Sequence, residues 1–492
     1  MKFLPLITVA ICLFFIPIST PEKLIFASTH FRHGARAPNS IDSDSLDRVG
    51  EHWPAPGQLT PVGMRMQYLL GLRNHKRYIE DYKLLSPTYD PHEILVYSTN
   101  YNRTLMSVFS QIQGLYPHKP EFGRSLNEEQ EIAAIPQVRV NESYIKEEVD
   151  IMNNSALPDF MTVLPIRMIS DVDKKANIYS DDTCVLAAYE ETKNSDQDSI
   201  IAVRYVFNEK YKKYLNEFFG ENSTYEFTWM TKFCDAFIAS YTDQRNITDL
   251  KNTGIDFEEL IESCYEVQKI KFRDYVLNGG KNKFDRLESS KLLREMMRLM
   301  KQRADDDINQ VTEVNSADFS RPKMLMFSAH DTTVSCHEMA MINCFNLDFD
   351  SFQLPKFTAQ MTFEVTRKDD SEISDISKLT YDDYTVNYYF NDEKLLSTSL
   401  SNFMEKLGNY LWTDEEVDNF CSGKNSSETD NSDDGNSKND NLVLYIVAIS
   451  VLGAVVLALI VSFIILLIMY RGIKTGGSGK SISLIGMSKS NN

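Results

Sequence analysis

Two strand–loop–helix units are predicted by the pattern of apolar and polar positions near the start of the chain. Residues 24–31 (LIFASTHF) and 94–99 (ILVYST) are short, mostly apolar runs that favour buried strands. A Thr-Pro pair at residues 60–61 is typical of a helix start, and apolar residues follow it at helical spacing. A second helix is predicted from Asn102 onward, where apolar residues recur on one face. Repeated strand–loop–helix units indicate an open α/β sheet.

Apolar strand patterns return late in the chain. Residues 323–328 (KMLMFS) predict another buried strand, which is followed by a helical stretch. Residues 357–365 and 385–390 alternate apolar and polar positions with the two-residue period of a strand. We expect these two to be antiparallel edge strands beside the parallel ones. The predicted fold is therefore α/β, with an open, mostly parallel sheet flanked by helices.

The middle of the chain has a different pattern. Residues from about 130 to 300 lose the strand alternation and are charged and mostly helical in pattern. We interpret them as an inserted, mainly helical cap domain. The α/β core then comprises about 21–130 and 300–421, and the complete folded unit comprises 21–421.

Both ends of the chain carry long apolar runs with different flanks. Residues 1–20 contain one lysine and then an apolar run, which is typical of a secretory signal peptide. Residues 442–470 carry no charge and are long enough for one transmembrane helix. Residues 422–441 are polar and acidic, typical of a flexible stalk, and 471–492 form a basic tail. The sequence thus predicts a single-pass type I membrane protein with a cytosolic tail and a lumenal (lysosome- or vacuole-like) or extracellular domain.

Composition adds a constraint on the partners. The chain has 492 residues, of which 42% are hydrophobic and 25% charged, as in globular proteins. Its formal net charge is −19, which argues against a nucleic-acid partner because such binding depends on basic contacts to phosphate. Any phosphate chemistry must therefore come from a local basic cluster.

Cysteines and glycosylation sequons agree with a compartment outside the cytosol. Apart from Cys12 in the predicted signal, the cysteines are even in number, which favours disulfides: Cys184, Cys234, Cys264, Cys336, Cys344 and Cys421. On a continuous helix Cys336 and Cys344 would lie about 12 Å apart, too far for a disulfide. Sequons that predict a glycoprotein begin at Asn102, Asn141, Asn153, Asn222, Asn246 and Asn425.

Two loops that follow predicted strands concentrate side chains capable of chemistry. The first loop places Arg32, His33 and Arg36 within five residues, and the second places His330 and Asp331 directly after a strand. Ligands of open α/β sheets bind beyond the carboxyl ends of the strands, so we expect the two loops to meet.

This set of side chains suits phosphoryl transfer. Arginine forks match phosphate oxygens and stay charged at any pH. Neutral His33 can attack phosphorus, and Asp331 can protonate the leaving group. His30 and His33 have an HxxH spacing, but no carboxylate ligand motif accompanies it. We expect neither a metal ion nor a cofactor, since the arginines supply the charge that Mg²⁺ supplies in other phosphoryl-transfer enzymes.

The motif RHGxRxP at residues 32–38 and the later HD pair resemble the signature of the histidine acid phosphatases. Residues 57–78, 96–117 and 325–335 resemble further segments of that family, closest to its prostatic and lysosomal acid phosphatase branch. The predicted membrane anchor and short tail resemble the lysosomal type. The resemblance implies a phosphoglycerate-mutase-like fold. It also implies that phosphate monoesters are hydrolysed to an alcohol and orthophosphate through a phosphohistidine at acid pH.

Position by position, the resemblance assigns a role to each candidate. His33 matches the histidine that becomes phosphorylated, and Asp331 matches the proton donor. The residues implied to bind phosphate are Arg32, Arg36, Arg103 and His330. Because Arg103 lies within the Asn102 sequon, we expect Asn102 to be unmodified.

The resemblance also implies a disulfide between Cys184 and Cys421, whereas the other four cysteines have no assigned partner. A homodimer is an expectation at the family level only. The same scaffold could serve a phytase or inositol-polyphosphate phosphatase, which needs extra basic pocket residues; the acidic cap argues against this. A catalytically silent surface receptor is the second alternative. The sequence does not specify the natural substrate.

Overall fold

The computed structural model describes residues 22–39, 49, 53, 55–135, 147, 149–169, 184, 197–220, 224–245, 247–281, 283–311 and 318–422. The predicted signal peptide, the transmembrane helix, the tail and all but the first residue of the stalk lie outside these residues. Within the described part of the chain, no helix is both long and apolar enough to cross a membrane.

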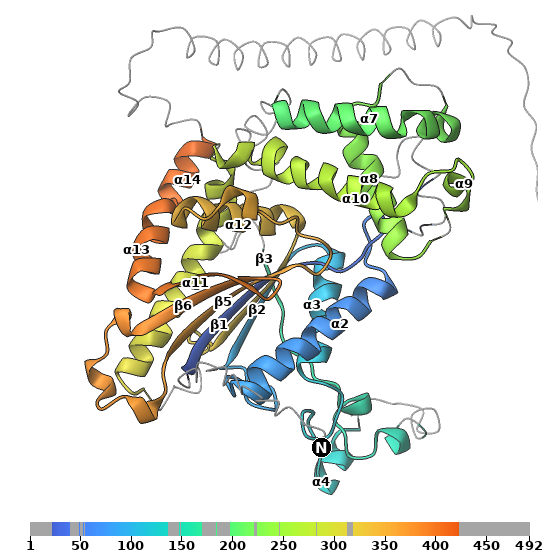
Figure 1. Cartoon of the computed structure of the whole chain (residues 1–492). Helices are drawn as coiled ribbons and strands as arrows, with labels where there is room; N and C mark the ends of the chain where they lie inside the picture. Colours follow the sequence, from blue (N-terminus) through green and yellow to red (C-terminus); the bar gives the residue numbers. More distant parts are fainter. Residues whose placement is uncertain are drawn as a thin grey trace, which may run out of the picture. The chain divides into compact units, whose positions relative to one another are not determined.

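A seven-stranded mixed sheet forms the centre of the fold (Figure 1). Its order is β3 (Arg167–Ile169), β2 (Ile94–Thr99), β4 (Met324–Ala329), β1 (Glu22–Arg32), β5 (Gln360–Lys368), β6 (Tyr384–Phe390) and β7 (Glu393–Ser399). The first four strands in this order are parallel to one another. The last three are antiparallel to their neighbours.

The predicted strands at 24–31, 94–99 and 323–328 are confirmed as β1, β2 and β4, and β5 and β6 are antiparallel as predicted. Neither is the edge strand that we expected, because β7 pairs with the outer side of β6. The expectation of a mostly parallel sheet was wrong, because parallel and antiparallel pairings are equally represented. Two strands were not predicted: β3, which adds a parallel pairing, and β7, which adds an antiparallel one. The β7 strand pairs with β6 across a turn at Asn391 and Asp392, whose φ angles of 45° and 73° suit a tight hairpin.

Helices cover both faces of the sheet. On one face lie α2 (Pro61–His75) and α3 (Asn102–Leu115), and both begin where the sequence predicts. Val108, Ile112 and Leu115 of α3 share a hydrophobic cluster with inward residues of β1, β2 and β4. On the other face α11 (Phe284–Ile308), α12 (Asp331–Phe345) and α13 (Leu400–Tyr410) pack against the sheet in a second cluster. The predicted cap ends at about residue 300, which lies inside α11, a helix that packs against the sheet.

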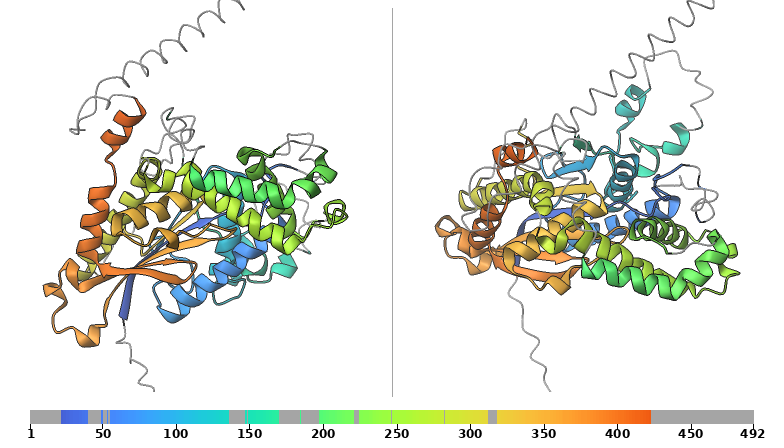
Figure 2. Two further views of the ribbon diagram at one scale, coloured as in Figure 1. Left: turned by 45° about the horizontal axis from the view of Figure 1, so that its top comes forward. Right: turned by 90° about the horizontal axis from the view of Figure 1, so that it is seen from above.

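A separate group of helices lies beside this core (green in Figure 2). It contains α7 (Asp198–Phe219), α8 (Phe227–Thr242), α9 (Thr248–Lys251) and α10 (Phe257–Ile270), which share their own hydrophobic cluster. The six-residue turn Lys271–Val276 continues α10 as a π-helix. We call α7–α10 and this turn the cap helices.

Two disulfides join distant parts of the chain. Cys184 pairs with Cys421 at the end of α14 (Asp414–Cys421), which confirms the pairing implied by the family resemblance. Cys234 of α8 pairs with Cys264 of α10, a pairing that sequence spacing did not predict. Cys336 and Cys344 both lie on the unbroken helix α12 and are thiols.

Short elements complete the described chain. The α4 helix (Glu128–Ala133) begins with a capping box at Asn127. Other helical turns are Lys76–Asp81, Pro158–Phe160, Asn278–Gly280, Phe349–Ser351, Asp370–Glu372, Ile376–Lys378 and Tyr381–Asp383.

Candidate active site

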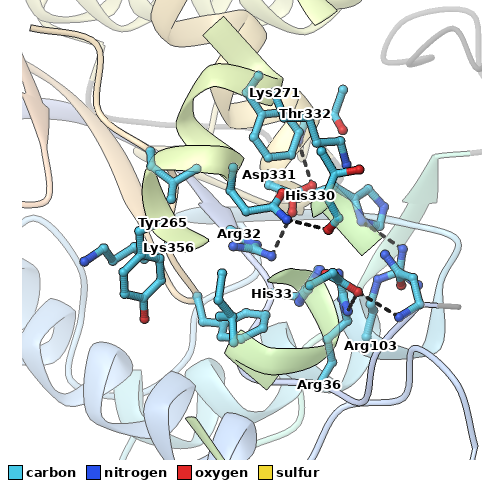
Figure 3. A pocket seen from close by; sticks show the side chains of 18 of the residues that line it. Arg32, His33, Arg36, Arg103, Tyr265, Lys271, His330, Asp331, Thr332 and Lys356 are labelled. Carbon is cyan, nitrogen blue, oxygen red and sulfur yellow. Dashed lines mark hydrogen bonds and ion pairs between the residues drawn. The ribbon is translucent and has the colours of Figure 1, made fainter. Parts of the chain in front are cut away.

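The candidate site lies where three parallel strands end. Arg32, the last residue of β1, is in register with Ala329, the last residue of β4, and β2 ends alongside at Thr99. The two loops predicted to meet therefore do so. They line a cavity of about 320 Å³ that the cap helices and the loop before β5 close from the other side (Figure 3).

The loop after β1 is held by very close backbone packing. The His33 amide donates to the carbonyl of Ala329 at 3.0 Å, and the Gly34 amide donates to Ser107 Oγ of α3 at 3.0 Å. A Cβ atom at Gly34 would lie 2.3 Å from the carbonyl oxygen of Gly63 in α2. Only glycine allows this approach, which fixes His33 above the sheet.

His33 is a buried, neutral imidazole. Its Nδ1 lies 2.9 Å from the carbonyl oxygen of Gly34, which can only accept, so Nδ1 carries the proton. Burial, then the charges of Arg32 and Arg36, hold the pKa of His33 well below its usual value. The second ring nitrogen, Nε2, therefore carries a lone pair in a cavity lined by arginines.

Arg32 is fixed by three kinds of contact. Its Nη2 lies 2.7 Å from Asp331 Oδ2, and its Nη1 donates to the carbonyl of Pro355 at 2.7 Å. The guanidinium carbon lies 4.4 Å from the ring centre of Phe357, a cation–π contact. Burial alone raises the pKa of Asp331, but Arg32 and Arg36 override it and hold that pKa far below its usual value.

Arg36 is paired with a carboxylate that the sequence did not reveal. Its Nη2 and Nη1 donate to the two oxygens of Asp235, at 2.8 and 3.2 Å, in a bidentate pair. Asp235 belongs to α8 and also accepts from the Asn39 amide at 3.0 Å. One of the cap helices thus contributes directly to the candidate site.

Arg103 and His330 form the third part of the site. Arg103 Nη2 donates to His330 Nδ1 at 3.3 Å, and His330 Nε2 lies 2.9 Å from Thr99 Oγ1. Thr99 uses its own hydroxyl proton to donate to Thr104, so His330 Nε2 must be the donor. Burial and the Arg103 charge lower the pKa of His330 to about 3, which keeps the ring neutral. Both ring nitrogens of His330 are therefore engaged with protein groups.

Each of the three arginines has one donor atom that the described residues leave unused. The Nε atoms of Arg32, Arg36 and Arg103 are buried and have no acceptor among the described residues. Buried donors without partners are rare, and an anion with several oxygens would satisfy them. The chemistry of these donors fits a phosphoryl group.

All six candidates named from sequence line this one cavity. His30 does not line the cavity. Its Nδ1 lies 3.1 Å from Nδ1 of His337 in the core, so His30 and His33, the two histidines of the HxxH spacing, do not share a site. The cavity residues that sequence reasoning missed include Lys232, Asp235, Tyr265, Lys271, Lys356 and Phe357. Lys232, Asp235, Tyr265 and Lys271 lie on helical segments and Lys356 and Phe357 in the loop before β5, and no local sequence pattern says what any of them faces.

Comparison with known proteins gives the family. Residues 23–391 match the sequence profile of the histidine phosphatase superfamily (branch 2). The chain belongs to this superfamily. Among its curated relatives, prostatic acid phosphatase of Bos taurus is 28% identical over 323 residues, which are 65% of this chain and 69% of that protein.

Other matches within the superfamily are shorter or show the fold alone. Lysosomal acid phosphatase of Xenopus laevis is 36% identical over 122 residues, 23% of this chain and 26% of that protein. The solved structure of the phytase from Citrobacter braakii superposes with a TM-score of 0.52 at 11% identity, covering 80% of this chain and 99% of that one. This supports the histidine phosphatase fold and says nothing of the substrate.

Proposed function

We propose that this histidine phosphatase is an acid phosphatase that hydrolyses phosphate monoesters to an alcohol and orthophosphate through a phosphohistidine. One observation carries the proposal: His33 is neutral, protonated on Nδ1, and lines the same cavity as three arginines with unused Nε donors. A nucleophile beside a cluster of donors that can bind an oxyanion is what phosphoryl transfer requires.

In the first step His33 Nε2 forms a bond to phosphorus while the bond to the leaving oxygen breaks. Arg32, Arg36 and Arg103 stabilise the charge on the equatorial oxygens. Asp331 gives its proton to the leaving alcohol oxygen. In the second step water attacks phosphorus, the N–P bond breaks, and Asp331 takes the water proton. Orthophosphate leaves, and both side chains return to their starting state.

The acid requirement follows from the pair that Asp331 makes. The Arg32 charge, 2.7 Å away, keeps Asp331 ionised, so Asp331 alone is a poor acid. A bound phosphate offsets that charge and raises the pKa of Asp331 toward the acid range. His330, bound to Thr99 and Arg103, acts in this proposal by holding the Arg103 guanidinium toward phosphate.

Regions outside the described residues complete the proposal. We infer a signal peptide, a stalk and one transmembrane helix that place the catalytic domain in the lumen of a lysosome-like compartment or outside the cell. The reaction needs no metal in this scheme, because the guanidinium groups supply the positive charge.

The test is phosphate release from an aryl phosphate by the full-length protein in detergent. We expect activity that peaks below neutral pH, survives EDTA and disappears in His33→Ala. Acid quench should trap a phosphohistidine in the wild type and not in the variant. A folded protein without turnover would favour the silent receptor, and loss of activity in EDTA would contradict the arginine mechanism.

A phytase-type activity is the second candidate, because the cap helices bring basic side chains to the cavity as well as Asp235. Two lysines of the cap helices, Lys232 and Lys271, line it. Rates with inositol hexakisphosphate and with simple monoesters, measured side by side, separate the two functions.

A further inference from the structure

Three lysines line the cavity in addition to the three arginines. Lys232 comes from α8, Lys271 from the first position of the π-helical turn after α10, and Lys356 from the loop before β5. In Figure 3 Lys356 lies beside Tyr265 and Lys271 lies near Thr332 and Asp331. They come from three separate segments, so their convergence is a property of the fold.

These lysines have no carboxylate partners. Within the described part of the chain, none of the three lies in ion-pair contact with a carboxylate, although the charge of Lys271 helps to lower the pKa values of Asp235 and Asp331. Lys356 Nζ instead lies 3.8 Å from the ring centre of Tyr265, and Lys271 Nζ lies 5.0 Å from that of Phe272. These two ammonium groups lie over aromatic faces, and such a contact leaves ammonium hydrogens available for an anion.

The charges in the cavity exceed what one phosphoryl group needs. The lining carries three arginines and three lysines against only two carboxylates, Asp235 and Asp331. Each carboxylate is already paired with an arginine. Arg103 and the arginine Nε donors can meet a phosphoryl group, which leaves a net positive charge on the lysine side of the count. In a chain with a net charge of −19, this local surplus points to a further anion.

Part of the cavity wall is apolar. Ile238, Phe272, Leu354 and Phe357 line the same cavity. Such side chains favour carbon over water in the part of a substrate that lies against them.

We infer that the preferred substrates are phosphate monoesters whose leaving group carries a second anionic group on a short apolar spacer, bound by Lys232, Lys271 and Lys356. This rests on the proposed function, because the three arginines must hold the phosphate that is cleaved. The second group is a phosphate or a carboxylate. The lysines bind it in the ground state and in the transition state alike, so they lower KM more than they raise kcat.

The test compares alkanediol monophosphates with the bisphosphates of the same diols, from two to eight carbons, using the full-length protein. We expect kcat/KM of the best bisphosphate to exceed that of its monophosphate about tenfold or more, mainly through KM. A symmetric bisphosphate offers two ends, which accounts for about twofold of this. The triple variant Lys232→Gln, Lys271→Gln, Lys356→Gln should reduce the preference to that statistical factor. Lys251→Gln, on α9 and outside the cavity lining, is the matched control and should retain it.

Diffusional steering is the rival role for these lysines. It would lower kcat/KM of both substrates by similar factors in the triple variant, would vanish at high salt and would leave KM ratios unchanged; that pattern overturns the inference. A wild-type protein that treats both substrates equally overturns it as well.

A binding arm keeps the inference separate from the catalytic proposal. In His33→Ala, calorimetry should show the bisphosphate binding about tenfold more tightly than the monophosphate, even if neither is turned over. If the wild type shows no turnover but the variant shows this binding preference, the catalytic scheme is contradicted and the lysine subsite is still supported. Equal affinities would remove the subsite. An ω-carboxylate monophosphate in the same series tells which second anion is favoured.

Discussion

Asp331 Oδ2 and Arg32 Nη2 lie 2.7 Å apart, so the proposed acid is paired with a cation that the substrate must also use. The pair links phosphate binding to protonation, because a phosphate at Arg32 removes the field that keeps Asp331 ionised. Arg32 ends β1, and Asp331 begins α12 two residues after the end of the neighbouring strand β4, so the sheet register that pairs Arg32 with Ala329 brings the two together.

The first prediction tests Asp331 as an acid. Asp331→Asn should lower kcat for alkyl phosphates by about 10²-fold or more, the usual range for general acid catalysis. With 4-nitrophenyl phosphate the loss should be less than about tenfold, because nitrophenolate leaves without a proton. Steady-state rates with both substrates check this. Equal losses would show that Asp331 acts on something other than the leaving group.

The second prediction concerns the bidentate pair between Arg36 and Asp235. Asp235→Asn leaves a buried guanidinium without its carboxylate, which typically destabilises a protein by about 3–5 kcal/mol. Phosphate can replace that carboxylate, so adding orthophosphate should raise the Tm of the variant more than that of the wild type. Glu226→Gln, which breaks the exposed pair with Arg204, serves as the control. An identical phosphate shift in all three proteins would mean that phosphate does not contact Arg36.

The third prediction concerns Thr99, which accepts from His330 Nε2 at 2.9 Å. Thr99→Val removes the acceptor, so His330 can turn and Arg103 loses its orientation. A neutral hydrogen bond contributes about 0.5–1.5 kcal/mol, so kcat/KM should fall about 2–12-fold. Thr99→Ser keeps the hydroxyl and should recover most of the loss. If Val and Ser variants behave alike, the effect is one of packing and not of positioning.

The fourth prediction concerns the buried histidine pair His30 and His337, whose Nδ1 atoms lie 3.1 Å apart. Burial lowers the pKa of His337 to about 3, and burial and His337 lower that of His30. Because these folded-state values lie below the unfolded value, the unfolded chain binds more protons, and stability falls as pH drops below about 6.5. For His337 the loss at pH 4.5 is about 2–3 kcal/mol relative to pH 7.

Urea unfolding at pH 7 and pH 4.5 measures this directly. The double variant His30→Leu, His337→Leu should lose less stability between the two pH values than the wild type, whatever its stability at pH 7. Parallel pH slopes for the two proteins would show that the pair does not titrate on unfolding.

The sequence by itself determined the elements that carry the motifs. Arg32, His33, Arg36, His330 and Asp331 lie in two loops that follow strongly apolar strands, and such strands are legible from local pattern alone. Their convergence also followed, because carboxyl ends of parallel strands meet at one edge of a sheet. The helix starts at Pro61 and Asn102 were equally local.

Only the tertiary structure decided what faces the motif loops. Asp235, Lys232 and Lys271 lie about 200 residues further along the chain from Arg36, on helices whose docking direction no local pattern encodes. The same reason hid the Cys234–Cys264 disulfide and the short strand β3. The tertiary structure also decided that His30 and His33 lie apart. The imidazole of His30 lies in the core and that of His33 lies in the cavity. The pKa shifts followed last, because burial and neighbouring charge exist only once distant segments pack together.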